Sequence, residues 1–162
     1  MTSSASRRDD LRADIRRRTG IDEAMIERLI HAFYGKVRAD DLLGPFFAAR
    51  ISPAEWPVHL ETMVAFWSSV TLMTGRYHGR PMQAHERLPI DAAHFDRWLA
   101  LFRATAIEVG PPKAAAFIIE RAERIAISLE AGIESVQGRS LGRPGTFRLP
   151  SNVAKEPSHD EP

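Results

Sequence analysis

Apolar side chains recur at intervals of three and four residues along most of this sequence, and that spacing limits the folds open to it more than any other feature. It matches the α-helix, in which residues at i, i+3, i+4 and i+7 share one face. No alternating strand pattern, hairpin turn or internal repeat accompanies it. The sequence therefore predicts an all-α fold of amphipathic helices.

Four long helices are predicted, over residues 22–38, 57–74, 91–110 and 112–136. The last has the most regular apolar stripe, formed by Ile118, Ala122, Ile125, Ala126, Leu129, Ile133 and Val136. The inner face of 22–38 is expected to contain Ile26, Leu29, Ile30, Phe33, Tyr34 and Val37. That of 57–74 should contain His59, Met63, Phe66, Trp67 and Val70, and that of 91–110 Phe95, Trp98, Phe102, Thr105 and Val109. Stripes of this width must bury against one another, which predicts one shared core.

Proline and glycine mark the connections between these helices. Gly44-Pro45 is expected to break any helix within 40–50, because proline lacks an N–H and glycine is a poor helix former. A short turn is expected over 53–56, with the helix beginning at about Pro57 and ending at about Thr74, before Gly75.

The two ends of the chain differ from its middle. Residues 1–8 are predicted to be a solvated tail and 9–18 a short charged helix, so that 1–20 form a flexible or helical N-terminal segment. Residues 137–162, rich in Gly, Arg, Ser and Pro, are predicted to be a disordered tail. One domain is expected over 21–136.

Composition excludes several classes of function. The chain has 162 residues and a formal net charge of +1, which gives no electrostatic reason to expect a nucleic-acid partner or an acidic membrane surface. It has no cysteine, which excludes disulfides, thiolate catalysis and cysteine-bound cofactors. No window is apolar enough to span a membrane. Asp9, Asp10 and Asp14 argue against a transit peptide, because such peptides are poor in acidic residues. A cytoplasmic location is expected.

One histidine lies in a segment bounded by helix breakers. His85 follows Gly79 and Pro81 and precedes Pro89, so a short helix is expected there, too short for the core. Such a helix can present an imidazole to something large and apolar held between the longer helices. A single histidine in this setting is more often a surface residue, so its role depends on the residues around it.

The surrounding motifs occur in a characteristic order, namely Phe33-Tyr34, Gly44-Pro45-Phe46-Phe47, Trp56-x-x-His59, Phe66-Trp67, Tyr77-x-Gly79-x-Pro81-x-x-x-His85-x-x-Leu88 and Phe95-x-x-Trp98-Leu99-x-Leu101-Phe102. As a set they resemble the truncated haemoglobins of group III, over residues 21–135. The resemblance implies the shortened globin fold, a two-over-two helical sandwich around a haem pocket, with haem b as cofactor.

The resemblance also implies roles for individual residues. His85 matches the proximal histidine that ligates the haem iron. The family's distal positions, on the other side of the iron, are the candidate catalytic residues Tyr34, His59 and Trp98, and the pocket-lining residues are Phe47, Met63, Phe66 and Trp67. Plain core roles stay open for Tyr34, Trp67 and Trp98. Pro57 can redirect His59, which could instead turn toward solvent as a gate.

The distal residue types suggest redox chemistry. Bound oxygen carries partial negative charge, so Tyr O–H and Trp N–H donors would retain it and polarise its O–O bond. The expected function is reaction of dioxygen, nitric oxide or peroxide, by nitric oxide dioxygenation or a peroxidase-like step, rather than transport. No flavin or nicotinamide motif is present, so a separate reductase is expected. Alternatives are a ligand sensor or oxygen store, and a cofactor-free helical interaction domain. A zinc site using His78, His85 and His94 is a weaker alternative, because their spacing matches neither a closed nor a catalytic zinc site.

Overall fold

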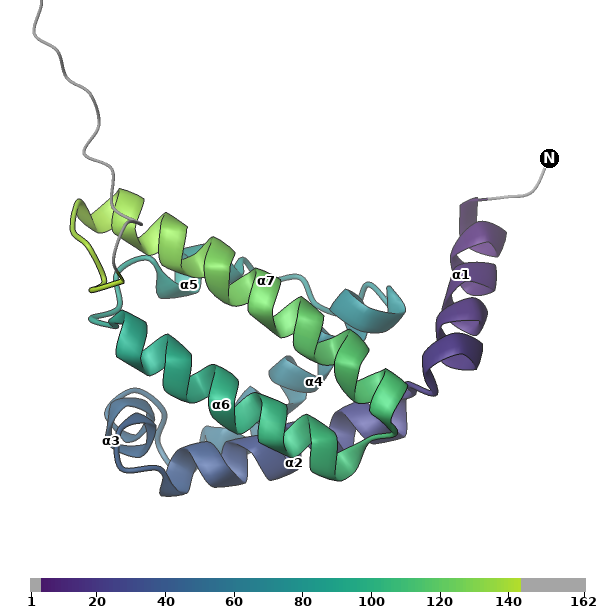
Figure 1. Ribbon diagram of the computed structural model, residues 1–162, viewed down its shortest axis with the longest axis horizontal. Helices are drawn as coiled ribbons and strands as arrows, with labels where there is room; N and C mark the ends of the chain where they lie inside the picture. Colours follow the sequence, from purple (N-terminus) through teal and green to yellow (C-terminus); the bar gives the residue numbers. More distant parts are fainter. Residues whose placement is uncertain (1–3, 144–162) are drawn as a thin grey trace, which may run out of the picture.

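The computed structural model describes residues 4–143, and within that range the secondary structure is α-helical. The predicted all-α class is confirmed. Figure 1 shows the helices, which are α1 (Ser4–Thr19), α2 (Glu23–Ala39), α3 (Leu43–Ala48), α4 (Trp56–Leu72), α5 (Pro81–His85), α6 (Ala92–Val109) and α7 (Pro112–Gln137).

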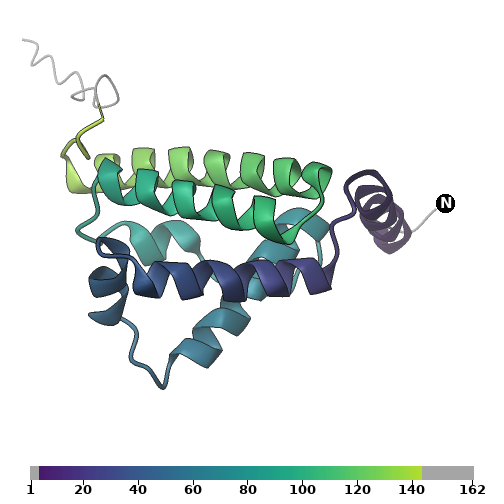
Figure 2. The same ribbon diagram turned by 60° about the horizontal axis from the view of Figure 1, so that its bottom comes forward.

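Two helix pairs, one over the other, make up the body of the protein. Helices α6 and α7 run side by side, joined by the short turn at Gly110-Pro111, while α2 packs against both α6 and α4 (Figures 1 and 2). The short helix α3 packs against α2, and α5 packs against α7. The predicted two-over-two sandwich is confirmed. Helix α1 projects from one end of the molecule.

The core is built from the predicted apolar faces. Phe33, Trp67 and Phe102 are its largest fully buried side chains, and smaller ones surround them. One member of the predicted stripe on α7 is misplaced, since Val136 is 53% exposed. The inner side of that last turn is occupied by Ile133 and by Gln137, whose amide reaches backbone carbonyls of the loop after α5.

The prediction that Gly44-Pro45 breaks any helix is wrong, because both residues lie inside α3. Pro45 sits in the first turn, where a missing N–H costs no intrahelical hydrogen bond. The Asp40 carboxylate accepts from the backbone N–H groups of Leu42 and Leu43, which starts the helix. Gly44 is needed because a Cβ there would lie 2.7 Å from the Arg38 carbonyl oxygen.

Helix α4 begins as expected but ends earlier than predicted. A turn over residues 53–55 precedes it, and the Glu55 carboxylate accepts from the Ser52 N–H at 2.7 Å. The helix stops at Leu72 because Met73 adopts a left-handed conformation with φ of 53°. Arg12 from α1 donates to the Met73 carbonyl at 2.7 and 3.2 Å, which satisfies a group that the helix end leaves free.

The terminal segments pack more than the sequence predicted. The expected helix over 9–18 extends back to Ser4, and Ile15 anchors it with only 5% exposure, whereas its predicted partner Leu11 is 43% exposed. After α7, Leu141 is 2% exposed and Arg143 pairs with Glu130. Residues 138–143 therefore do not match the predicted disordered tail. The rest of that prediction, from 144 onward, lies outside the described residues, as does the start of the N-terminal one.

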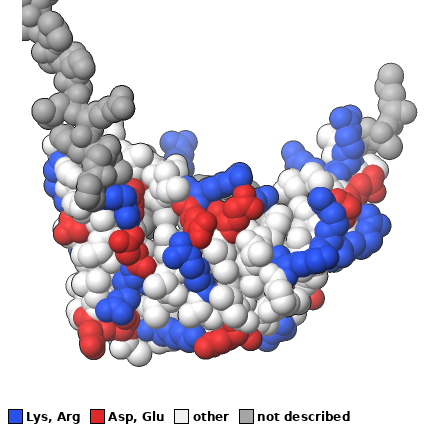
Figure 3. Space-filling view, in the orientation of Figure 1, with Lys and Arg blue, Asp and Glu red and all other residues white. Residues whose placement is uncertain are grey.

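Charged side chains of both signs are interspersed over the face shown in Figure 3. Ion pairs also join helices, as in the Lys36–Glu108 pair between α2 and α6 and the Arg103–Glu123 pair between α6 and α7. Both pairs are substantially exposed, so each contributes little to stability. No helix within residues 4–143 combines the length and the apolar character that a membrane crossing requires.

Candidate haem site

A cavity of about 580 Å³ opens between the helices, within the range of about 300–1,000 Å³ that small-molecule and cofactor sites have. Its lining is mostly apolar and aromatic. Every site residue predicted from the sequence contributes to the lining, namely Tyr34, Phe47, His59, Met63, Phe66, Trp67, His85 and Trp98. The fold therefore brings together side chains from α2, α3, α4, α5 and α6.

His85 is the last residue of α5 and is half-buried. Its Nδ1 atom lies 2.6 Å from the carbonyl oxygen of Pro81, one helical turn earlier. A carbonyl can only accept, so Nδ1 must carry the proton and donate. The other ring nitrogen, Nε2, then keeps its lone pair. Metal-binding histidines have this arrangement, since the second hydrogen bond fixes both the tautomer and the ring orientation.

Tyr34 lies buried on α2, with its ring edge-on to Phe33 at 4.9 Å and to Phe47 at 6.0 Å between ring centres. Burial raises the pKa of Tyr34 above its ordinary value, so the hydroxyl keeps its proton at neutral pH. Within residues 4–143 this hydroxyl has no hydrogen-bond partner, although it belongs to a cavity-lining residue. It is a neutral donor held in place by aromatic rings.

His59 lies near the start of α4, wedged between two rings. Its imidazole is edge-on to Tyr34 and to Trp56, each at 5.3 Å between ring centres. Its Nε2 is buried and has no hydrogen-bond partner among the described residues. Burial lowers the pKa of His59, so the ring is neutral at pH 7. Pro57 does not turn His59 away from the cavity, because the residue lines it.

The two tryptophans are placed differently. Trp67 is 1% exposed and packs against Phe102 at 4.8 Å between ring centres, so it belongs to the core as well as to the cavity wall. Trp98 is half-buried on α6 and stacks on Phe102 at 5.2 Å, with an interplanar angle of 17°. The Trp98 indole N–H has no acceptor within the described part of the chain.

Several lining residues were not predicted as site residues. Among them are Phe46, Arg50, Ile51, Tyr77, Leu88, Ile90, His94, Phe95, Ile125 and Leu129. Phe46, Tyr77, Leu88 and Phe95 stood within the quoted motifs, so a signal was present for these. His94 lies in the first turn of α6, where its Nδ1 accepts from the Asp91 N–H at 3.1 Å. Its ring also lies 5.6 Å from that of Phe46, at the cavity.

The donor set suits haem better than a protein-only metal site. Across residues 4–143, no three His, Asp or Glu side chains lie close enough to hold a metal ion, so the zinc alternative with His78, His85 and His94 is not formed. Haem iron needs only an axial ligand from the protein, because the porphyrin supplies its other ligands. A flat apolar cofactor, one histidine with a free Nε2, and partnerless polar atoms elsewhere on the wall fit this cavity.

Comparison with known proteins agrees with this geometry. Residues 18–130 match the bacterial-like globin family. A group 3 truncated hemoglobin of Campylobacter jejuni is 36% identical over 109 residues, which are 65% of this chain and 86% of that protein. The crystal structure of a group III truncated hemoglobin from Campylobacter jejuni matches with a TM-score of 0.65 and 35% identity, covering 67% of this chain and 88% of that one.

Globins bind haem and, at its iron, small ligands. The family match therefore supports the haem-binding prediction over a cofactor-free helical domain. The prediction made from the motifs is confirmed: this chain belongs to the bacterial-like globin family, as a group III truncated haemoglobin.

Proposed function

We propose that His85 ligates the iron of a non-covalently held haem b, and that Tyr34 and Trp98 retain a small ligand for redox chemistry rather than for transport. The absence of cysteine from the whole sequence supports the non-covalent form. The cytoplasmic location and the separate reductase remain predictions. Haem supplies the iron at which dioxygen, nitric oxide or peroxide binds and reacts.

The observation that carries this proposal is a set of partnerless polar atoms in the cavity wall. We call Tyr34, His59 and Trp98 the distal group. Within residues 4–143, the Tyr34 hydroxyl, the His59 Nε2 and the Trp98 N–H have no hydrogen-bond partner. Of these atoms the His59 Nε2 is buried, and buried polar groups are nearly always paired in folded proteins. A ligand that accepts their hydrogen bonds would satisfy these atoms.

The chemistry of the two donors points to reaction rather than transport. A hydrogen bond to a charged group contributes about 1.5–3 kcal/mol, or about ten- to hundred-fold in residence time. Tyr34 and Trp98 together would make a partly negative ligand leave slowly, which a carrier must avoid. Preorganised donors also stabilise the charge that builds up when an O–O bond is polarised. His59, being neutral, can accept or donate one further hydrogen bond.

The proximal side supports the same proposal. The Nδ1–H of His85 donates to the Pro81 carbonyl, and such a hydrogen bond makes the other nitrogen a stronger ligand. Haem held through such an electron-rich imidazole would be better suited to redox reactions.

Stopped-flow kinetics would test the proposal. The oxygenated protein is mixed with nitric oxide, and turnover with peroxide is measured beside it, for the wild type and for Tyr34→Phe. Fast oxidation by nitric oxide, or peroxide turnover, that falls in Tyr34→Phe would support redox chemistry. Slow reactions with both, together with fast oxygen release, would contradict it and favour an oxygen store or sensor.

A further inference from the structure

Helix α5 cannot hold His85 in place by itself. It has five residues, and at its ends the Ala84 N–H donates to the Arg80 carbonyl and the Glu86 N–H donates to the Met82 carbonyl. None of its residues is buried. Isolated helices shorter than about 12 residues are not stable in water, so this one depends on its surroundings. What holds its two ends therefore decides where the His85 ring points.

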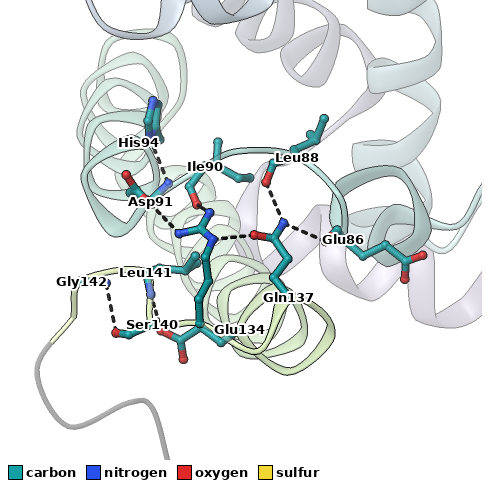
Figure 4. A network of polar contacts seen from close by, with 11 residues as sticks. Glu86, Leu88, Ile90, Asp91, His94, Glu134, Gln137, Ser140, Leu141 and Gly142 are labelled. Carbon is teal, nitrogen blue, oxygen red and sulfur yellow. Dashed lines mark hydrogen bonds and ion pairs between the residues drawn. The ribbon is translucent and has the colours of Figure 1, made fainter.

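The loop that follows His85 has two different sides. The side chains of Leu88 and Ile90 line the cavity. The backbone carbonyls of Glu86 and Leu88 turn outward, and each accepts a hydrogen bond of 2.9 Å from the side-chain nitrogen of Gln137, at the end of α7 (Figure 4). Both N–H hydrogens of the Gln137 side-chain amide are thus donated to this loop.

Arg139 fixes the orientation of the Gln137 amide and adds further hydrogen bonds to the same loop. Its Nε donates to the Gln137 side-chain oxygen at 2.7 Å, which leaves the amide nitrogen facing the loop. Its Nη2 donates to the Ile90 carbonyl at 3.1 Å, and its Nη1 pairs with Asp91 at 2.9 Å. The carbonyls of Glu86, Leu88 and Ile90 are therefore hydrogen-bonded to two side chains that also bond to each other.

The segment that follows α7, residues 138–143, is held through the backbone and the side chain of Leu141. The Leu141 carbonyl accepts from the Ala92 N–H at 2.8 Å. The Leu141 N–H donates to the Glu134 carboxylate at 2.9 Å (Figure 4). Its side chain packs in a buried cluster with Ile90 and Ile133. At the other end of α5, Met82 lies so close to Gly132 of α7 that a Cβ there would overlap its sulfur. Helix α7 and its extension thus hold both ends of α5.

From these contacts we infer that Gln137 and Arg139 are positioning residues for the proximal bond to the haem iron. They hold the loop that leaves His85, and through it the direction of the imidazole. Both lie beyond residue 130, where the match to the bacterial-like globin family ends. The inference rests on the proposed ligation of iron by His85.

The test uses the full-length haem protein with Gln137→Leu, which keeps the bulk of the side chain but removes both donors. Resonance Raman spectra of the ferrous form report the iron–histidine stretching band, and transfer to an excess of haem acceptor reports haem loss. Losing the hydrogen-bond partner of a metal ligand itself costs about 10–100-fold in affinity. Gln137 holds the loop and not the ligand, so we expect a shifted or broadened band and haem loss faster by about ten-fold, at the lower end of that range. Arg139→Met should act in the same direction.

Ser135→Leu is the matched control, because it places the same side chain at an exposed position of the same helix. It should keep the band and the haem-loss rate of the wild type. If Gln137→Leu and Arg139→Met do so too, at unchanged helix content, the inference is overturned. If one of them cannot be purified, the other decides.

A further variant, His85→Gly, distinguishes a failure of the positioning inference from a failure of the proposed function. Loss of the band in His85→Gly, with no effect in the other two variants, would refute the positioning role alone. A band that survives in His85→Gly would show that His85 is not the ligand, and both proposals would then fall.

Discussion

The two sides of the cavity are built in opposite ways. On the distal side, Tyr34 and Trp98 belong to long helices and are held by ring packing, while their polar atoms have no hydrogen-bond partner within residues 4–143. On the proximal side, His85 belongs to a five-residue helix, and its Nδ1 and the carbonyls of Glu86 and Leu88 in the following loop are hydrogen-bonded. Ring packing places a donor without using up its hydrogen bond. Hydrogen bonding from a neighbouring segment can aim a side chain that its own helix is too short to hold.

The largest expected effect on the distal side is that of Tyr34→Phe. The ring packing against Phe33 and Phe47 stays, and only the buried donor is lost. Because a hydrogen bond to a charged group contributes about 1.5–3 kcal/mol, oxygen dissociation should become about ten- to hundred-fold faster. Stopped-flow ligand replacement measures it. Tyr77→Phe, which removes the hydroxyl of the other cavity tyrosine, is the matched control and should leave the rate unchanged. Equal oxygen dissociation rates for wild type and Tyr34→Phe would show that Tyr34 is not a distal donor, and the contrast between the two sides of the cavity would be wrong.

Trp98→Phe should give a smaller acceleration in the same assay. A phenyl ring can still stack on Phe102, but the indole N–H is lost. Trp98 is half-buried, so water can partly replace its hydrogen bond, and we expect about ten-fold, near the lower limit for such a bond.

Trp67→Phe is the contrasting variant, because Trp67 lies in the core. It should lower the stability through lost packing and leave oxygen dissociation little changed. If Trp67→Phe speeded oxygen dissociation and Trp98→Phe only lowered the stability, Trp67 would be the distal donor and Trp98 the core residue.

The smallest expected effect is a pH dependence of stability due to His59. Burial lowers the pKa of His59 in the folded protein, whereas an unfolded histidine has a pKa of 6.5. Below pH 6.5 the unfolded chain takes up a proton that the folded chain resists, so the free energy of unfolding falls as the pH falls. Urea unfolding of wild type and His59→Phe at about pH 7.5 and about pH 5.5 should show a smaller acid loss in the variant. His31→Phe, at an exposed position of α2, should keep the wild-type loss, and an equal loss in all three proteins would argue against a buried neutral His59.

The long helices could be predicted because they follow from periodic spacing. Eight of the cavity-lining residues were predicted as well, because the motifs that contain them resemble a known family. Tyr34, His59 and Trp98 lay on predicted inner faces, and they do line one cavity. Helix α3 was missed because a proline in a first turn has the same sequence signal as a proline that breaks a helix.

The support for the proximal side was not predicted, for a different reason. Gln137 and Arg139 bind backbone carbonyls roughly fifty residues earlier in the chain, and such contacts follow no sequence period. A polar side chain at a helix end, followed by Gly and Arg, is also typical of a solvated terminus. Only the position of the loop after α5 relative to α7 shows whether such side chains are solvated or bind another segment.

The most direct test of the account is the ferrous spectrum of His85→Gly with and without added imidazole. The account predicts that the variant loses the five-coordinate histidine-ligated spectrum and that free imidazole, entering the space left by the side chain, restores it. A variant whose spectrum matches the wild type without imidazole would show that the iron is held by another residue, and the division into proximal and distal sides would be wrong.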